Sequence, residues 1–266
     1  MGVRTFLTAL FVVLTATSAY AAPCETEDFD TKVTGVSQCL LMRRYGLTEP
    51  TAIVVWLHGD VSSGGPANYH FPLAQKAAED FSASSVMSVA LVRPGYPDGS
   101  GASSTASIFH GGRSDHYTQE NIAEVGAVIE KLRLKYKPKS VIIVGHSGGA
   151  ATAAVLLGMK PQLAAAAVLV SCPCELVSWR SGRGGRHWGR SENPTRWAER
   201  ISASTRVIAL TGANDDNTSP NLASNYVDLL RSRGIDATFQ IVAEATHNTA
   251  LRSAEVFDAI AKLLPR

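Results

Sequence analysis

Three kinds of side chain in this 266-residue sequence could act together in nucleophilic catalysis. Ser147 lies in the run Gly145-His146-Ser147-Gly148-Gly149, and Asp215, Asp216 and His247 follow it along the chain. A serine hydroxyl becomes a good nucleophile when a neutral imidazole accepts its proton and a carboxylate orients that imidazole. The residue types therefore predict acyl-transfer chemistry, provided that the fold brings them together.

The neighbours of Ser147 predict a tight turn between a strand and a helix. Residues 141–144 are apolar and mostly β-branched, as in a buried strand, and the Ala-rich residues 150–159 favour a helix. Gly145 and Gly149 allow the two backbones to approach, so that Ser147 is presented at the top of the turn. A plain Gly-rich turn at a helix N-terminus is the alternative, and the flanking elements favour the nucleophile.

The other catalytic candidates follow predicted strands, where functional groups of parallel sheets gather. Asp215 and Asp216 come after the strand 206–211, and His247 comes after the strand 237–242. Chemistry alone does not separate the two aspartates. The Gly-x-x-Asp spacing favours Asp215 as the acid and leaves Asp216 to brace the loop.

A tetrahedral intermediate also needs two donors aimed at its oxyanion. We expect them to be the backbone amides of Gly148, directly after the serine, and of Asp60, after the strand that ends in Leu57-His58-Gly59. His58 and His146 are interpreted as residues that support their loops rather than as proton carriers.

The order of elements predicts an α/β fold with a mostly parallel sheet of about eight strands, helices on both faces and no large lid domain. The first two strands form a hairpin and are the expected antiparallel edge. The expected strands are 33–39, 40–45, 52–57, 86–92, 141–144, 165–170, 206–211 and 237–242. The expected helices are 66–81, 118–136, one from 148, 221–233 and 248–264.

Composition and the N-terminus limit the class of protein. Residues 1–21 resemble a secretory signal peptide, with Arg4, an apolar stretch too short to span a membrane, and the small-x-small site Ala19-Tyr20-Ala21. We therefore expect a secreted or periplasmic protein with one catalytic domain at 22–266. A formal net charge of +2 argues against nucleic acid as a partner, and no stable membrane insertion is expected.

Export to an oxidising compartment would favour disulfides, and the four cysteines form an even set that can pair completely. Cys24, Cys39, Cys172 and Cys174 allow three connectivities, of which we favour the two local pairs, Cys24–Cys39 and Cys172–Cys174. No histidine has the spacing of a zinc site, so neither a metal nor another cofactor is expected.

Several motifs together resemble the α/β-hydrolase superfamily, nearest to its dienelactone-hydrolase and prolyl-oligopeptidase-like branch. They are Val55-Trp56-Leu57-His58-Gly59, Arg93-Pro94-Gly95-Tyr96, Gly145-His146-Ser147-Gly148-Gly149, Gly212-Ala213-Asn214-Asp215 and Thr246-His247-Asn248. The resemblance spans about residues 35–266 and implies a metal-independent serine hydrolase. It implies Ser147 as nucleophile, Asp215 as acid and His247 as base. A serine stands where true dienelactone hydrolases have cysteine.

The excursion 172–205 takes the place of a short lid and contains three of the four tryptophans, interleaved with arginines. Trp179 and Arg183 are candidates for a wall that binds anionic or aromatic groups, although a solvated loop with packed tryptophans is equally compatible with the pattern. The loop Arg93–Ser104, which contains Tyr96, is expected to line the same mouth.

The leading hypothesis is an exported serine hydrolase, a carboxylesterase that cleaves small soluble esters. An exported serine peptidase of the prolyl-oligopeptidase-like type is the first alternative, with a short peptide as substrate. A non-catalytic binding protein on a hydrolase fold is the second. The physiological substrate and the oligomeric state are not determined by the sequence.

Overall fold

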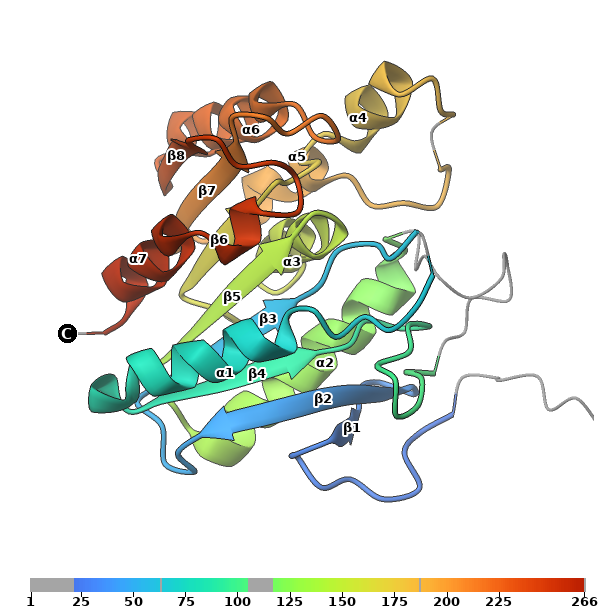
Figure 1. The fold of residues 1–266 in the computed structure, drawn as a ribbon, viewed down its shortest axis with the longest axis vertical. Helices are drawn as coiled ribbons and strands as arrows, with labels where there is room; N and C mark the ends of the chain where they lie inside the picture. The colour runs from blue at the N-terminus through green and yellow to red at the C-terminus, as the bar shows by residue number, and fades with distance from the viewer. Residues whose placement is uncertain (1–21, 63, 105–116, 187, 266) are drawn as a thin grey trace, which may run out of the picture.

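One mostly parallel sheet organises the chain. The computed structural model describes residues 22–62, 64–104, 117–186 and 188–265. Within them the sheet order is β1-β2-β4-β3-β5-β6-β7-β8 (Figure 1). The strands are β1 (Lys32–Thr34), β2 (Cys39–Gly46), β3 (Ala52–Leu57), β4 (Val86–Leu91), β5 (Ser140–His146), β6 (Ala166–Val170), β7 (Arg206–Gly212) and β8 (Asp236–Val242).

The direction of the strands confirms the predicted α/β class. All neighbouring pairs from β4 to β8 are parallel, and only β1 and β2 form antiparallel pairs at one edge. Every residue of β3, β4 and β6 is buried, as the continuous apolar runs predicted. The opposite edge strand, β8, has four exposed residues because only one of its sides has a neighbouring strand.

Helices cover both faces of the sheet (Figure 1). The helices α2 (Gln119–Tyr136), α3 (Gly148–Met159) and α6 (Pro220–Ser232) share one apolar cluster with the sheet. The helices α1 (Phe71–Asp80) and α7 (Ala254–Leu263) share the cluster on the other face. This three-layer arrangement directs the carboxyl ends of the parallel strands toward one rim.

The strand order reverses between β3 and β5. The chain passes from β3 through α1 to β4, and then through α2 to β5 on the other side of β3. Loops diverge to opposite faces at such a point and leave a crevice at the carboxyl ends of the strands. Here those ends carry the segment after Leu57 and the segment after His146.

Two predicted helices differ from the observed ones. The helix expected over 66–81 begins only at Phe71, because Pro72 lacks an amide hydrogen and fits only the first turn. The helix expected over 248–264 is divided into a 3₁₀ turn, η3 (Ala250–Arg252), and α7. Ser253 separates them with extended dihedral angles, φ −73° and ψ 155°.

The excursion between β6 and β7 has more regular structure than expected. It contains α4 (Leu176–Gly182), α5 (Pro194–Trp197) and the 3₁₀ turn η2 (Ala198–Arg200). The Glu175 carboxylate caps α4 by accepting a hydrogen bond from the Ser178 amide at 2.6 Å. A short 3₁₀ turn, η1 (Ser82–Ser84), completes the elements between α1 and β4.

Both local cysteine pairs are present as disulfides, Cys24–Cys39 and Cys172–Cys174. The first connects the N-terminal segment to the start of β2, and the second closes the turn that follows β6. Among the described residues no helix has the length and apolar character that crossing a membrane would require.

Candidate active site

Ser147 occupies a strained turn between β5 and α3. Its dihedral angles are φ 52° and ψ −118°, a conformation that a non-glycine residue adopts only when its surroundings impose it. Two glycines make the turn possible. A Cβ on Gly145 would overlap the backbone of Gly149 and Ala150, and a Cβ on Gly149 would overlap the carbonyl oxygens of Leu57 and His58.

Asp215 and His247 form a hydrogen-bonded pair near this turn. His247 Nδ1 lies 3.0 Å from Asp215 Oδ2 and 3.1 Å from Oδ1. Asp215 also accepts hydrogen bonds from the Asn217 amide at 3.0 Å and the Thr218 amide at 2.8 Å. Burial alone would raise the pKa of Asp215, but the hydrogen bonds from His247 and Thr218 outweigh it and hold the pKa below its usual value. The carboxylate is therefore ionised over the whole neutral range.

The structure distinguishes the two neighbouring aspartates. The Asp215 side chain contacts the imidazole, whereas Asp216 is exposed at the rim of the adjacent cavity. Since a carboxylate can only accept, His247 Nδ1 carries the proton in this pair, and Nε2 of the neutral ring keeps its lone pair.

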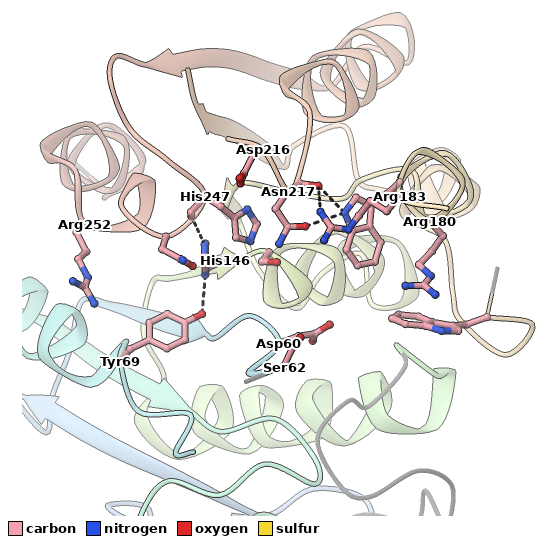
Figure 2. Close-up of a pocket in the computed structure, with 14 residues that line it drawn as sticks. Asp60, Ser62, Tyr69, His146, Arg180, Arg183, Asp216, Asn217, His247 and Arg252 are labelled. Atoms are coloured by element: carbon pink, nitrogen blue, oxygen red, sulfur yellow. Dashed lines mark hydrogen bonds between the residues drawn. The ribbon is translucent and has the colours of Figure 1, made fainter. Parts of the chain in front are cut away.

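Ser147 and His247 line one cavity of about 690 Å³ at the carboxyl rim of the sheet (Figure 2). Both residues are largely buried, with 8% of the surface of each exposed. Trp179 and Arg183, two of the residues predicted to bind substrate, line the same cavity. The fold thus brings groups that are 100 positions apart in the sequence to one place.

A chain of hydrogen bonds connects the loop after β3 to the loop that carries His247. The Gly59 amide donates to the Tyr69 hydroxyl at 2.5 Å, and this hydroxyl lies 2.7 Å from His146 Nδ1. His146 Nε2 lies 2.8 Å from the carbonyl oxygen of His247 (Figure 2). A carbonyl only accepts, so Nε2 carries the proton and Nδ1 accepts from Tyr69. Burial lowers the pKa of His146 to about 4, which keeps this neutral form at neutral pH.

Tyr69 is a site residue that no pattern in the sequence indicates. It lies just before α1, and no periodicity or motif distinguishes it. Its partner His146 is 77 positions away, so only the tertiary structure reveals the contact. His146 was expected to support its turn, and its two ring nitrogens are used in this way.

The loop after β3 lies directly against the serine. A Cβ on Gly59 would come within 2.9 Å of Ser147 Cβ. The Gly59 amide is used by Tyr69, which leaves the next amide, that of Asp60, as the candidate donor in this loop. Gly148 follows the serine and begins α3. These are the two positions that the sequence predicted for oxyanion donors.

The Asp60 side chain belongs to a buried polar network behind these amides. Asp60 Oδ1 accepts from Arg93 Nη2 at 2.6 Å and from the Tyr96 hydroxyl at 3.0 Å, and Oδ2 accepts from the Tyr117 hydroxyl at 2.6 Å. A Cβ on Gly148 would lie 2.5–2.6 Å from Arg93, Asp60 and Tyr117 atoms. Glycine at position 148 therefore lets the network reach the start of α3.

The expectation for Tyr96 was wrong. Its ring is fully buried and its hydroxyl bonds Asp60, so it holds the network and does not line the cavity. The loop Arg93–Ser104 was also expected to line the cavity, and none of its residues does so. The loop is directed inward because the buried guanidinium of Arg93 requires a counterion, which Asp60 supplies inside the protein. Tyr96 follows Arg93 into the same network by donating to Asp60.

His58 is equally confined. Its Nδ1 lies 2.7 Å from the carbonyl oxygen of Gly59, and its Nε2 accepts from the Arg93 amide at 2.9 Å. Complete burial and the nearby Arg93 hold the pKa of His58 well below its usual value. Both ring nitrogens are occupied in the neutral form, so this histidine supports the loop.

The tryptophan- and arginine-rich excursion is divided between packing and cavity. Trp179, Arg180, Arg183 and Trp188 line the cavity (Figure 2), whereas Trp197 lies against Gly158 and donates to Glu192 at 2.9 Å. His187 lies outside the described residues. Within the described residues, no cluster of histidine, cysteine, aspartate and glutamate has the arrangement of a metal site.

Solved structures with the same architecture include peptidases and esterases. An acylaminoacyl peptidase of Pyrococcus horikoshii has a TM-score of 0.64 at 12% identity, over 88% of this chain and 41% of the peptidase. The esterase Pf2001 of Pyrococcus furiosus has a TM-score of 0.64 at 13% identity, over 92% of this chain and 97% of the esterase. Est1E of Butyrivibrio proteoclasticus, solved with ferulic acid, has a TM-score of 0.63 at 13% identity, over 87% and 96%.

The fold is that of an α/β-hydrolase, and together with the family match that follows it confirms the resemblance found in the sequence. A model of the prolyl oligopeptidase family matches residues 95–264, well over half of the chain, and the chain belongs to this family. It spans only 41% of the acylaminoacyl peptidase. No curated protein matches it.

Proposed function

We propose that this chain is an exported serine hydrolase that cleaves small esters through an acyl-enzyme on Ser147. The observation that carries the proposal is the bond between Asp215 and His247 beside the cavity that Ser147 lines. Asp215 holds the Nδ1 proton, so Nε2 of His247 is the base. The strained turn presents Ser147 at the cavity that His247 also lines.

The acylation step follows from these assignments. His247 Nε2 accepts the Ser147 proton while Oγ bonds to the ester carbonyl carbon, and the carbonyl oxygen becomes negatively charged. The amides of Gly148 and Asp60 donate to that oxygen. The bond to the alcohol then breaks, and His247 returns its proton to the leaving alkoxide.

Deacylation repeats these steps with water as the nucleophile. His247 takes a proton from the water, the hydroxide adds to the acyl carbon, and the bond to Ser147 Oγ breaks as the histidine reprotonates it. The products are a carboxylic acid and the regenerated serine. No other group is required by this scheme.

The decisive experiment is labelling with a fluorophosphonate probe, which reacts with activated serines. The wild type should be labelled and Ser147→Ala should not. Ser62→Ala is the matched control, because Ser62 lines the same cavity but lies outside the strained turn that carries Ser147, and its loss should leave the label in place. An unlabelled wild type, or label retained in Ser147→Ala, would instead favour a binding protein on a hydrolase fold.

A peptidase of the same family is the second candidate, and the match to the prolyl oligopeptidase family favours it. Ester and amide cleavage share every catalytic group, so the substrate decides between them. Comparison of p-nitrophenyl acyl esters with aminoacyl p-nitroanilides tests this point. Turnover of the esters alone supports the esterase, whereas faster turnover of the anilides supports the peptidase.

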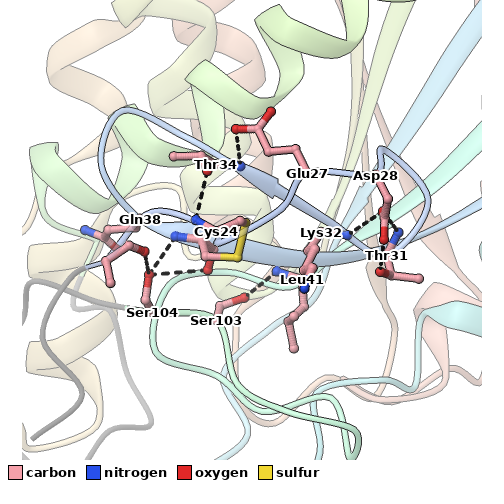
Figure 3. Close-up of a disulfide and its surroundings, with 12 residues drawn as sticks. Cys24, Glu27, Asp28, Thr31, Lys32, Thr34, Gln38, Leu41, Ser103 and Ser104 are labelled. Carbon is pink, nitrogen blue, oxygen red and sulfur yellow. Dashed lines mark hydrogen bonds between the residues drawn. A yellow bond between two sulfur atoms is a disulfide. The ribbon is translucent and has the colours of Figure 1, made fainter.

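Export is part of the proposal, and the disulfides support it. Cys24–Cys39 secures the segment that follows the proposed signal peptide (Figure 3), where the Cys24 amide also donates to Thr34 Oγ1 at 2.9 Å. Disulfides persist mainly in oxidising compartments. Fractionation of cells and N-terminal sequencing of the mature chain test the proposal, which predicts an N-terminus close to Ala22. A chain that retained residues 1–21 in the cytoplasm would contradict it.

A further inference from the structure

The cavity beside Ser147 has an excess of positive charge. Three arginines line it, Arg180, Arg183 and Arg252, against two carboxylates, Asp60 and Asp216. The charge of Asp60 is already balanced by the buried guanidinium of Arg93 at 2.6 Å. Among the described residues that line the cavity, Asp216 is then the only carboxylate left to balance the positive charges of the three arginines.

Two of the arginines stand together on one wall. Arg180 and Arg183 both come from α4 and its C-terminal end, whereas Arg252 lies on the opposite side of His247 (Figure 2). The Arg180 guanidinium lies 4.4 Å from the ring centre of Trp188, which orients it. Trp179 meets Trp188 edge-on at 6.1 Å. The wall therefore combines flat apolar surface with oriented positive charge.

The hydrogen bonds that hold this wall leave its charge uncompensated. Arg180 Nε donates to the carbonyl oxygen of Arg186 at 3.2 Å, and Arg183 Nη1 donates to that of Asn217 at 3.4 Å. Both acceptors are neutral. Within the part of the chain that the structure describes, neither arginine forms an ion pair, so both can take a carboxylate from a ligand.

Trp179 connects the wall to the catalytic loop. Its Nε1 donates to the Asn217 carbonyl oxygen at 3.0 Å, and the Asn217 amide donates to Asp215. A group bound on the wall is thus held in fixed relation to the proposed acid and base. This connection gives the wall a position suited to substrate selection.

We propose that Arg180 and Arg183 select esters that carry a carboxylate, which they bind beside the indoles of Trp179 and Trp188. The proposal rests on the proposed hydrolase function and specifies its substrate class. The carboxylate belongs either to the acyl group or to the alcohol, and both are recognised by the same chemistry.

The experiment compares kcat/KM for matched charged and neutral esters. Mono-4-nitrophenyl glutarate against 4-nitrophenyl butyrate tests the acyl side, and 4-acetoxybenzoate against its methyl ester tests the alcohol side. A partly exposed ion pair contributes up to about 1 kcal/mol, or roughly fivefold. We expect the charged ester to be preferred by up to about fivefold in one pair, with a preference that falls in 1 M NaCl.

Variants locate the site. The double variant Arg180→Gln/Arg183→Gln should lose the preference, and Arg180→Lys/Arg183→Lys should restore part of it. Asp216→Asn should increase it, because a repelling charge is removed. Arg186→Gln is the matched surface control, since its side chain is exposed and lies outside the cavity, and it should keep the preference.

Arg252→Gln tests whether the preference comes from Arg180 and Arg183 themselves or from the overall positive potential of the cavity. If it reduces the preference as much as the double variant does, the assignment to Arg180 and Arg183 is overturned. Equal rates for charged and neutral esters in the wild type also overturn it. That result differs from failure of the proposed function, which would show as no ester turnover and no fluorophosphonate label. The salt dependence is measured on the wild type, so it remains decisive if the double variant does not fold.

Discussion

Replacing Tyr69 by phenylalanine removes one hydroxyl from the centre of the hydrogen-bond chain between Gly59 and His247. The Gly59 amide and His146 Nδ1 would both lose their partner, while the ring could keep its place. A matched control is Tyr226→Phe, because the Tyr226 hydroxyl is buried without a hydrogen-bond partner among the described residues. The two variants make the same chemical change in different surroundings.

The expected loss of stability follows from the groups left behind. A buried polar group without its partner costs about 1–3 kcal/mol. Each kcal/mol lowers Tm by about 2–4 °C in a chain somewhat smaller than this one. We therefore expect Tm of Tyr69→Phe to fall by roughly 2–12 °C, and that of Tyr226→Phe to stay the same or rise slightly.

The catalytic effect should be larger in kcat than in KM. Gly59 lies against Ser147 and precedes the proposed oxyanion donor Asp60, and His146 holds the backbone of the proposed base. Small displacements of such groups cost roughly 10- to 100-fold in rate. Melting curves and ester kinetics of the two variants measure both effects. If Tyr69→Phe behaves like Tyr226→Phe in Tm and kcat, the hydrogen-bond chain does not position the site.

Three further predictions concern the site and its support. Asp215→Asn should lower kcat by about 10⁴-fold by misorienting His247, whereas Asp216→Asn should keep turnover of neutral esters within a few-fold; the reverse order would exchange their roles. Gly149→Ala should destabilise the fold by more than about 1–3 kcal/mol, because its Cβ overlaps two backbone carbonyls, and wild-type-like denaturant unfolding would contradict this. Stability should decrease as pH falls from about 6.5 toward 4. The reason is that His146, whose pKa is about 4 in the folded protein, takes up a proton more readily in the unfolded chain. Calorimetry across that range tests whether stability falls, and a rise would contradict the prediction.

Much of the fold was predictable because it depends on local patterns. Continuous apolar runs mark strands that are buried on both faces, and the alternation with amphipathic helices implies a parallel sheet. The helix boundaries were less predictable. Pro72 delays the start of α1, and Ser253 divides the last helix, through backbone effects that hydrophobic periodicity does not contain.

The candidate site shows the same division. The turn at Ser147 was predictable, since its glycines and flanking elements lie within a few residues of one another. The role of Tyr96 was not, because whether an aromatic side chain faces a cavity or a buried carboxylate depends on residues more than 30 positions away.

By itself, the sequence determined the class of the fold, the strained serine turn and the set of groups available for catalysis, because these depend on neighbouring residues. The tertiary structure alone decided which aspartate meets His247, how Tyr69 and His146 connect the loops around Ser147, and which arginines reach the cavity. Those contacts join residues that are far apart in the chain. Their distances are set by the packing of the whole sheet and its helices, which no local pattern encodes.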